Sequence, residues 1–589
     1  MTEYLPRLVS PGYWFVAPYE SLATHNDFKS APWVGPCIYD TSGELVWSGA
    51  NEVDGANVLD FRINNVNGED MITLSDRDLG TGIVLDAAYE IHDVVQMESS
   101  PGQINGHEFH FVDNGTKVLM LKNERKKATE AASQSIGFNG ECITHFVSII
   151  ELDATAWNQT FSWDSYDHVR LDESTFVEDF PQTICTHGSM GWDYIHANSV
   201  DKNEDGDYIL SGRHTNTLYK ISGQDGSIIW RLEGYRDRSD FEMVDIQFSR
   251  QHNVRWRGKN ETHTFISFLD NAWGEDRQQP SSAHSRGLLV ALDEKDMIAT
   301  IESVYNHPKG NGGFARKRGS LDVLPNGNVF MGWSSLARHS EHTPNGKLIM
   351  EAELMAEWLG SYRNYKFDFV GRPATLPALH CAAYGAANET VETQVHVSWN
   401  GATEVAAWRL YKTTATGDNA ELVASANKTG FETRVLYGGY ASFVYVEALD
   451  AHSNVLARTG VQKTITHPNV TSQAILEEQQ WLQKAGMDLR VLVLGSPTMV
   501  FLFGLAVGAT LLAVTWLVLN QGRVLLGRKR TMYEPVYEKR FDVDEDEDET
   551  LVEGDSEIDG ACLDREQEKR ADGELRLESK KLINGLGIA

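Results

Sequence analysis

The chain has 589 residues, which is too many for one compact core, so we expect several domains. Its formal net charge of −32 argues against nucleic acid as a partner, because phosphate binding needs clustered Lys and Arg. Four cysteines precede an apolar segment near residue 500, an even number that allows two disulfides in three pairings: Cys37, Cys142, Cys185 and Cys381.

Short apolar strands separated by polar turns fill the first predicted domain, residues 10–365. In one recurring pattern the second strand of a hairpin often ends on Trp, as at 38–47, 149–163 and 219–230, with a looser copy at 289–301. In another, Asn-Gly or Asp-Gly supplies the positive φ of a tight turn, as at 111–120, 203–211 and 323–333. Repeated hairpins without helices predict an all-β fold, a β-propeller, with one large β-sandwich as the alternative.

A second all-β pattern follows over residues 366–465. Apolar and polar residues alternate there over about a hundred residues, a size and pattern that resemble an immunoglobulin or fibronectin type III sandwich. Residues 466–497 then form a predicted stalk, helical around 474–489.

One transmembrane helix is predicted over residues 498–520. Residues 499–519 carry no charge, and 21 residues are long enough for the ~30 Å hydrocarbon core, which favours a membrane span over a buried globular helix. Basic residues cluster after the span, at Arg523, Arg528, Lys529 and Arg530. The positive-inside rule therefore places the acidic, disordered tail of residues 521–589 in the cytosol.

This topology is single-pass type I, with the ectodomain outside the cytosol, at the plasma membrane or in a secretory or vacuolar compartment. Residues 1–10 contain no apolar signal-peptide core, so we expect a signal peptide upstream of them; an ectodomain that faces the cytosol is the alternative. Six N-x-S/T sequons precede the span and give weak support to a glycoprotein, and these are Asn114, Asn158, Asn260, Asn388, Asn427 and Asn469.

Three short segments carry the candidate chemistry: W-D-Y-I-H-A-N-S-V at 192–200, L-S-G-R-H-T-N at 210–216 and F-S-R-Q-H-N-V-R-W at 248–256. Each lies where a predicted strand meets a loop. An imidazole, a carboxamide and a guanidinium that converge in this way can hold a tetrahedral oxyanion such as sulfate, and a second imidazole can attack it. The spacing alone does not distinguish sulfate from phosphate or carboxylate.

Roles can be assigned to the residues of these segments. A neutral His252 is a suitable nucleophile toward sulfur, while Arg213 and Asn198 offer N–H donors to the oxyanion. If its segment is extended, His196 shares a face with Asn198, and it can protonate a departing phenolate. Taken singly, each residue also fits a framework role, as a hydrogen-bonded turn residue or a surface ion pair.

A further candidate is His107, in G-H-E-F-H-F-V-D-N-G. The H-E-F-H segment lacks zinc-ligand spacing, so we expect no metal site. No glycine-rich phosphate loop, dinucleotide fingerprint, G-x-S-x-G elbow or Cys-His nucleophile pattern is present. A group-transfer enzyme with this sequence would therefore use no nucleotide-activated donor, and we expect no cofactor.

These segments resemble the arylsulfotransferase (arylsulfate sulfotransferase) family, in particular its eukaryotic, mainly fungal, membrane-anchored branch, over roughly residues 10–370. The first segment is similar to the family's D-[WY]-x-H-x-N-S, and S-G-R-H is similar to its S-x-R-H. Q-H-N-V followed by F-I-S-F-L-D-N-A resembles Q-H-D-A with I-S-L-F-D-N-A, and G-H-E-F with N-G resembles H-D-F with N-G-N.

The resemblance implies a six-bladed propeller with its site at the central channel. His252 would be the histidine that is transiently sulfated, and four residues would bind and stabilise the sulfuryl group: His107, His196, Asn198 and Arg213. The substrates would be small molecules, an aryl sulfate donor and a phenolic acceptor, which react by a ping-pong mechanism.

Three positions depart from the family pattern. Asn253 replaces the Asp after the nucleophile, Leu269 replaces Phe in F-D-N, and Glu108 replaces Asp. If that Asp orients the catalytic imidazole, Asn253 would weaken it. Two hypotheses follow: a membrane-anchored sulfotransferase, or a non-catalytic propeller ectodomain that binds a ligand or protein partner.

Overall fold

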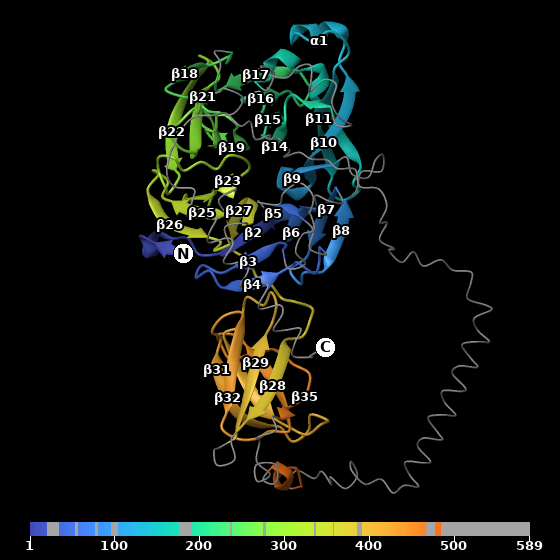
Figure 1. Cartoon of the computed structure of the whole chain (residues 1–589), viewed down its shortest axis with the longest axis vertical. Coiled ribbons are helices and arrows are strands. Elements are labelled where there is room, and N and C mark those ends of the chain that lie inside the picture. The colour runs from blue at the N-terminus through green and yellow to red at the C-terminus, as the bar shows by residue number, and fades with distance from the viewer. Residues whose placement is uncertain are drawn as a thin grey trace, which may run out of the picture. The chain divides into compact units, whose positions relative to one another are not determined.

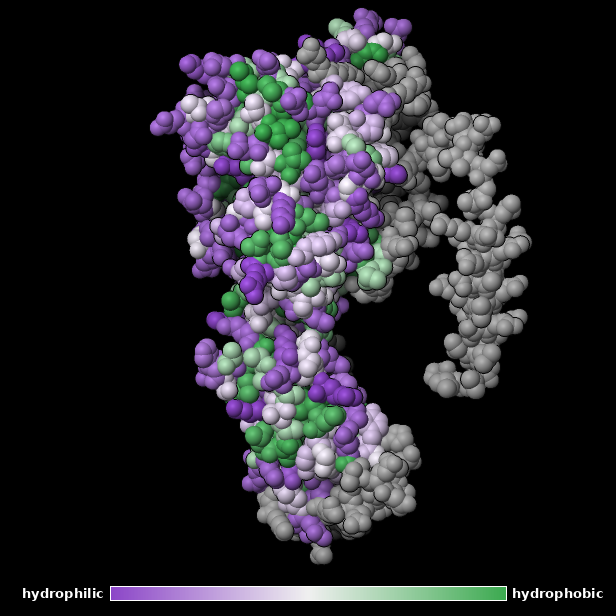
Figure 2. Space-filling model, turned by 90° about the vertical axis from the view of Figure 1, so that its left-hand side faces the viewer, coloured by the Kyte–Doolittle hydropathy of each residue, from purple (hydrophilic) through white to green (hydrophobic). Residues whose placement is uncertain are grey.

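The computed structural model describes residues 1–20, 34–53, 57–76, 80–95, 104–175, 185, 191–235, 238–274, 279–334, 337–356, 359–385, 391–466 and 478–483. Residues 484–589 lie outside these ranges. The described part is all-β, as predicted. The face shown in Figure 2 is mostly hydrophilic with small apolar patches, which agrees with the charged composition.

Six sheets of four or five strands account for the strands between residues 2 and 367. Their innermost strands are β5 (Val58–Val66), β9 (Ile104–Val112), β14 (Ala197–Lys202), β19 (His252–Lys259), β23 (Ser320–Val323) and β27 (Leu359–Phe367). Next to these lie β6 (Glu69–Asp76), β10 (Lys117–Lys127), β15 (Tyr208–Gly212), β20 (Thr264–Asp270), β24 (Val329–Gly332) and β2 (Tyr13–Glu20).

The third strands of the six sheets are β7 (Thr81–Leu85), β11 (Ile143–Asp153), β16 (Thr217–Ile221), β21 (Arg286–Asp293), β25 (Arg338–His342) and β3 (Cys37–Tyr39). The fourth are β8 (Ile91–Val95), β12 (Gln159–Asp164), β17 (Ile228–Glu233), β22 (Ile298–Asn306), β26 (Leu348–Glu353) and β4 (Leu45–Ser48). Three short strands extend the sheets: β1 (Thr2–Glu3), β13 (Trp192–Asp193) and β18 (Glu242–Val244).

Short helices lie between some of the strands in the described residues before β27. They are η1 (Pro6–Leu8), η2 (Asp113–Gly115), α1 (Glu130–Ser135), η3 (Ser165–Asp167) and η4 (Leu171–Glu173).

The predicted hairpins are confirmed by the strand pairing. The Asn-Gly and Asp-Gly turns connect first to second strands, β9 to β10, β14 to β15 and β23 to β24. The other pattern connects third to fourth strands, and its tryptophans lie buried on the outer strands β4, β12 and β17. Gly115 shows why the first pattern needs glycine, because it has a φ of 82° and a Cβ there would lie 2.3 Å from the Asn65 carbonyl oxygen.

The six sheets form a closed ring in which each packs on its two neighbours (Figure 1). A separate apolar core fills each of the six sheet–sheet interfaces. The ring closes where β27, the last strand, pairs antiparallel with β2 from the start of the chain. This arrangement explains the repeated hairpins, because no single sheet of this kind can bury both of its faces without neighbours.

A buried ionic layer joins the innermost strands at the centre of the ring. The Glu108 carboxylate on β9 accepts hydrogen bonds from Arg255 of β19 (2.7 and 3.0 Å), from Arg363 of β27 (3.0 Å) and from the Val200 N–H of β14 (3.1 Å). Arg363 also donates to Asp60 of β5 at 2.8 Å and to the Asn198 carbonyl at 2.8 Å. Two carboxylates and two guanidiniums therefore balance in charge and connect five of the six innermost strands.

Burial alone would raise the pKa of the Asp60 carboxyl, but the facing Arg363 guanidinium holds that pKa well below its usual range. Asp60 is therefore a carboxylate at neutral pH, and the layer depends on complete pairing, since an unpaired charge at this depth is costly.

The described residues between 378 and 466 form two further sheets, and one large apolar core contains residues of both. One contains β28 (Ala378–Tyr384), β29 (Glu392–Ser398), β32 (Glu432–Tyr437) and β36 (Ile465–Thr466). The other contains β30 (Ala407–Lys412), β31 (Glu421–Asn427), β33 (Phe443–Leu449), β34 (Val455–Arg458) and β35 (Gln462–Lys463). Of the predicted stalk, residues 478–483 are described and are helical.

No helix in the described ranges is long and apolar enough to cross a membrane. The predicted span at 498–520 and the tail at 521–589 lie outside the described residues.

One disulfide is present in the described part of the chain, between Cys142 and Cys185. The expectation that all four cysteines could pair is wrong for the other two. Cys37 on β3 and Cys381 on β28 are buried free thiols, and burial raises the pKa of each to about 11.

We expect Arg363→Met to destabilise the ring by about 3–5 kcal/mol, because it removes the guanidinium that Asp60 and Glu108 share and leaves the two buried carboxylates of the layer with one guanidinium, that of Arg255. Urea denaturation, followed by tryptophan fluorescence, measures this change. Arg125→Met on β10 is the control, since Arg125 is exposed. Equal midpoints for the two variants would show that the ionic layer does not hold the ring together.

Candidate functional site

The candidate residues lie where the innermost strands begin. The ionic layer joins the first halves of these strands, since Asp60, Asn198 and Arg255 lie near the starts of β5, β14 and β19, and Glu108 and Arg363 lie at the middle of β9 and β27. His107 immediately precedes Glu108, and His196 and His252 lie one residue before β14 and at the start of β19. The site therefore lies next to the ionic layer.

The ring of His252 has a defined tautomer. Its Nδ1 lies 2.8 Å from both the Arg250 carbonyl oxygen and the Asn271 Oδ1. Because both atoms are acceptors, Nδ1 carries the proton and Nε2 keeps its lone pair. Nε2 in turn accepts a hydrogen bond from the Arg318 backbone N–H at 3.1 Å.

His252 is 3% exposed, and its electrostatic setting keeps it neutral. Burial lowers the pKa of His252 well below its ordinary range, and the nearby Arg213 guanidinium lowers it further. The ring is therefore an uncharged imidazole at physiological pH, which is the form that a nucleophile needs.

His196 is held by Asp193. The Asp193 carboxylate accepts from the His196 backbone N–H at 2.8 Å and bonds to the ring Nδ1 at 2.6 Å. Burial would raise the pKa of Asp193, but His196 holds it well below its usual range, so Asp193 is a carboxylate that accepts from the His196 ring.

His196 and Asn198 do not share a face of one strand, contrary to the prediction for an extended segment. His196 has a φ of 45° and precedes β14, so the segment is not extended there. Asn198 is fully buried, and its Nδ2 donates to the Gln251 carbonyl at 2.8 Å. One Asn198 N–H therefore joins β14 to the segment before β19, and its predicted role at the oxyanion stays a prediction.

Arg213 and His214 follow β15 and lie against the His196 turn. The Arg213 and His214 backbone N–H groups donate to the carbonyls of His196 and Ile195, each at 3.0 Å. The Arg213 Nη1 donates to the His214 Nε2 at 3.0 Å. Pairing of β14 with β15 places Ala197 opposite Gly212, and this explains why two segments separated in sequence meet.

His107 completes the cluster of rings. Its ring lies 5.3 Å from that of His196 and 5.7 Å from that of Tyr362, measured between centroids. Its Nδ1 is hydrogen-bonded to the Asn105 Oδ1, and Tyr362 donates its hydroxyl to the His107 carbonyl at 2.9 Å. The structure thus groups His107, His196 and Arg213. His252 lies near enough to this group for Arg213 and His196 to lower its pKa.

A metal site was not expected, yet three potential ligands converge. Atoms of Asp193, His196 and His214 lie within 4.8 Å of one another. The His214 ring, however, bonds to the Asp193 carbonyl through Nδ1 and to Arg213 through Nε2. With the Arg213 guanidinium beside these atoms, the group favours an anion over a cation.

Sequence reasoning missed Asn271 and Arg318. Asn271 lies in the L-D-N-A segment, which was visible as a motif, and its Nδ2 donates to the carbonyls of Ala315 (2.7 Å) and Arg318 (3.0 Å). The Arg318 contribution comes from a backbone N–H, which no motif reveals.

The departure at Asn253 has a structural explanation. The Asn253 Oδ1 accepts from the Leu321 N–H at 3.0 Å and so joins β19 to β23. The partner of the His252 ring is Asn271 and not residue 253.

Comparison with known proteins gives one family. Residues 62–355 match the family model described as arylsulfotransferase (ASST). No curated protein matches the chain.

Several solved structures are similar at low identity. They include a protein of unknown function from Bacteroides caccae (10% identity, TM-score 0.34, 61% of this chain and 99% of that one). Hydrazine synthase of Kuenenia stuttgartiensis is similar at 8% identity and a TM-score of 0.31, over 59% of this chain and 96% of that one. A streptogramin B lyase is also similar, at 10% identity and a TM-score of 0.28, over 64% of this chain and 94% of that one. At these values they carry no argument about function.

We expect Asn271→Ala to cost more stability than Asn253→Ala. Asn253→Ala leaves the buried Leu321 N–H without its acceptor, a loss of about 1–3 kcal/mol. Asn271→Ala removes two donors and the Asn271 acceptor at His252, a loss of about 2–4 kcal/mol. Urea midpoints of the two variants give the comparison, and an equal or reversed order would contradict the assignment of Asn271 as the support of His252.

Proposed function

Because residues 62–355 carry a domain of the arylsulfotransferase (ASST) family, we propose that this protein transfers a sulfuryl group from a phenolic sulfate ester to a phenolic acceptor. The transfer uses no nucleotide and passes through a sulfohistidine at His252. The observation that carries this proposal is the tautomer of His252, a neutral ring with its Nε2 lone pair directed away from its supports and with Arg213 nearby.

In the first step the Nε2 lone pair attacks the sulfur of the aryl sulfate. An N–S bond forms, the S–O bond to the ring breaks, and the phenolate leaves with the electron pair. His196, supported as a cation by Asp193, donates a proton to this phenolate. Arg213 and His107 stabilise the sulfuryl oxygens, together with one remaining Asn198 N–H.

The Arg318 N–H has a place in this step. It occupies Nε2 in the structure, so attack requires that its hydrogen bond be replaced by the bond to sulfur. The released N–H then lies beside the sulfuryl group and can donate to one of its oxygens, as backbone donors do in oxyanion holes.

In the second step the acceptor phenol attacks the sulfur and transfers its proton to His196. The N–S bond breaks and its electrons return to Nε2, which restores the neutral ring. The Asn271 and Arg250 acceptors hold the Nδ1 proton throughout, so the same nitrogen is used in both steps.

The proposed fold follows from the same family. Each of the six sheets is one blade of a six-bladed propeller, with the site at its channel. Pairing of β27 with β2 and the six apolar interfaces support this interpretation. The two sheets of residues 378–466 form an immunoglobulin- or fibronectin III-like sandwich, which their shared core supports.

We further propose a single-pass type I membrane glycoprotein of the fungal branch, with the propeller in the lumen or outside the cell. The exposure of the sequons at Asn114, Asn158, Asn260 and Asn427 supports this location, as does the Cys142–Cys185 disulfide. Asn388 and Asn469 lie outside the described residues.

The alternative is an ectodomain that binds a ligand or partner without catalysis. The hydrogen bond from Arg318 to the His252 Nε2 favours it, because a permanently occupied Nε2 cannot attack. A measurement of sulfuryl transfer distinguishes the enzyme from the non-catalytic binding protein.

We expect His252→Ala to lower sulfuryl transfer by a factor on the order of 10³ or more, because it removes the nucleophile. The measurement is phenolate release from p-nitrophenyl sulfate with a phenol acceptor. His452→Ala is the control, since His452 is an exposed histidine of the sandwich. Without acceptor, mass spectrometry should find one sulfuryl group on His252. Phenolate release that does not depend on His252 would overturn the mechanism. No phenolate release at all would favour the non-catalytic alternative.

For the location, we expect an N-glycan at Asn427, which is exposed on β31, when the chain is made in its native host. An amidase that removes N-glycans should increase the electrophoretic mobility of the protein. The increase should be larger for the protein with Asn427 than for the Asn427→Gln variant, which has one glycan fewer. A chain without glycan at any of its six sequons would contradict the lumenal orientation.

A further inference from the structure

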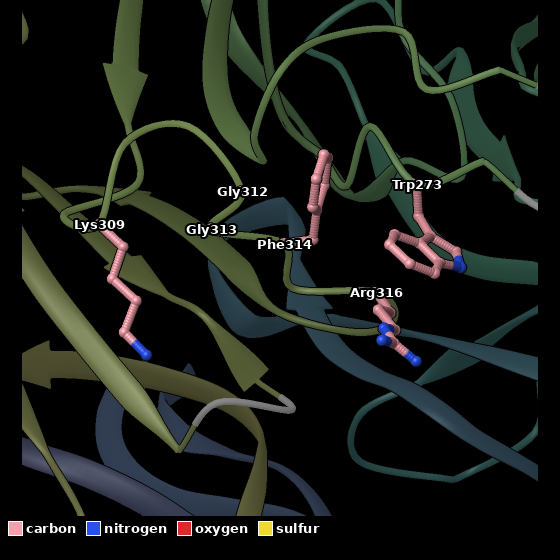
Figure 3. A pocket seen from close by; sticks show the side chains of 6 residues that line it. All are labelled: Trp273, Lys309, Gly312, Gly313, Phe314 and Arg316. Atoms are coloured by element: carbon pink, nitrogen blue, oxygen red, sulfur yellow. The ribbon is translucent and has the colours of Figure 1, made fainter. Parts of the chain in front are cut away.

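A pocket lined by Trp273 and by residues between 309 and 316 combines aromatic and cationic side chains. Its volume is about 320 Å³, and its lining residues are Trp273, Lys309, Gly312, Gly313, Phe314 and Arg316 (Figure 3). A cavity of about 150 Å³ already takes up benzene, so this pocket has room for one substituted aromatic ring. Two glycines contribute no side chain, and none of the lining residues is acidic.

The aromatic wall consists of Trp273 and Phe314, whose ring centroids lie 5.4 Å apart at 67°. The Arg316 guanidinium carbon lies 4.3 Å from the centroid of the Trp273 ring. Figure 3 shows Arg316 beside Trp273 on one side of the pocket and Lys309 on the other. A guanidinium that stacks on an aromatic face keeps its in-plane N–H donors, and these match a carboxylate.

The charge around the pocket is unusual for this chain. Residues 303–321 contain Lys309, Arg316, Lys317 and Arg318 but no Asp or Glu, although the whole chain carries −32. Lys309 and Arg316 are exposed, and within the described ranges neither has a carboxylate partner. The side chains that line the pocket therefore carry two positive charges and no negative charge, which favours an anionic ligand.

The pocket and His252 share one segment. Phe314 and Arg316 line the pocket, while the Ala315 carbonyl accepts from Asn271 and the Arg318 N–H donates to the His252 Nε2. Two residues of chain span at most about 7 Å, so the Arg316 backbone lies within that distance of Arg318. The pocket wall and the backbone group that bonds the proposed nucleophile therefore belong to one continuous segment.

We propose that this pocket binds the aromatic ring of a phenolic substrate that carries a second, anionic substituent, such as a carboxylate. Trp273 and Phe314 contact the ring, and Arg316 and Lys309 pair with the anion. The assignment of this ligand as a substrate rests on the proposed sulfuryl transfer, whereas its binding does not.

Binding is tested first with the full-length His252→Ala protein, which cannot form the sulfohistidine. Titration calorimetry compares 4-hydroxybenzoate with its uncharged analogue 4-hydroxybenzamide. We expect the benzoate to bind more tightly, and its preference to shrink as salt increases. Equal affinities for the two compounds would overturn the proposal.

Variants separate the two kinds of contact. Arg316→Gln and Lys309→Gln should each weaken the benzoate by up to about five-fold and leave the benzamide unchanged, as expected for exposed ion pairs. Trp273→Leu should weaken both compounds, and Arg125→Gln, an exposed arginine on β10, should weaken neither. If the Arg316→Gln/Lys309→Gln double variant still binds the benzoate more tightly than the benzamide, the anion binds elsewhere.

Kinetics with intact His252 test the substrate role. With p-nitrophenyl sulfate as donor, Arg316→Gln should leave kcat unchanged. It should raise KM for 4-hydroxybenzoate by the factor by which the same substitution weakens benzoate binding in the calorimetry. If the benzoate binds with its charge preference but accepts no sulfuryl group, the pocket stands and the assignment of its ligand as an acceptor is wrong. If transfer occurs without any effect of Arg316 on KM or binding, the pocket proposal fails and the proposed function stands.

Discussion

The ring depends on the carboxylate of Glu108. It is fully buried, and it receives two guanidiniums and one backbone N–H from three other strands. Such an arrangement gains little net free energy over an apolar core, but it is costly to leave incomplete. Its effect is therefore on geometry, because only one relative placement of the innermost strands satisfies all of these donors and acceptors at once.

The site inherits its geometry from this layer. His107 is adjacent in sequence to Glu108, Tyr362 is adjacent to Arg363, and His252 precedes Arg255 by three residues. The ionic groups fix the strand ends, so the residues just before them have little freedom. Glu108, a departure from the family pattern at the sequence level, is thus explained by its buried partners.

Sequence patterns predicted the hairpins well because a hairpin is local. Asn-Gly, Asp-Gly and strand-ending tryptophans determine which consecutive strands pair, as β9 with β10 and β16 with β17 show. The patterns did not show that β27 closes the ring on β2, since that contact joins residues more than three hundred positions apart. The disulfide was left open for the same reason, because three pairings of four cysteines fit the sequence equally.

For the site, motifs located His107, His196, Arg213 and His252 but not the groups that define their states. Asp193 was within a quoted segment and received no role, although it orients His196. The same-face argument failed because the positive φ of His196 interrupts the strand. Backbone groups such as the Arg318 N–H carry no side-chain signature, so only the folded chain shows them.

Asn271 connects these observations. Its Oδ1 accepts from the ring of His252, and its Nδ2 holds two carbonyls of the segment that forms the pocket wall. The proton on the His252 Nδ1 and the position of the pocket wall therefore depend on one side chain. Any movement of residues 315–318 that frees Nε2 must keep or replace the two bonds to Asn271. Gly319 follows this segment with a φ of 103°, and a Cβ there would lie 2.4 Å from the Leu269 side chain and 2.7 Å from the Gly332 carbonyl oxygen, so this position requires glycine.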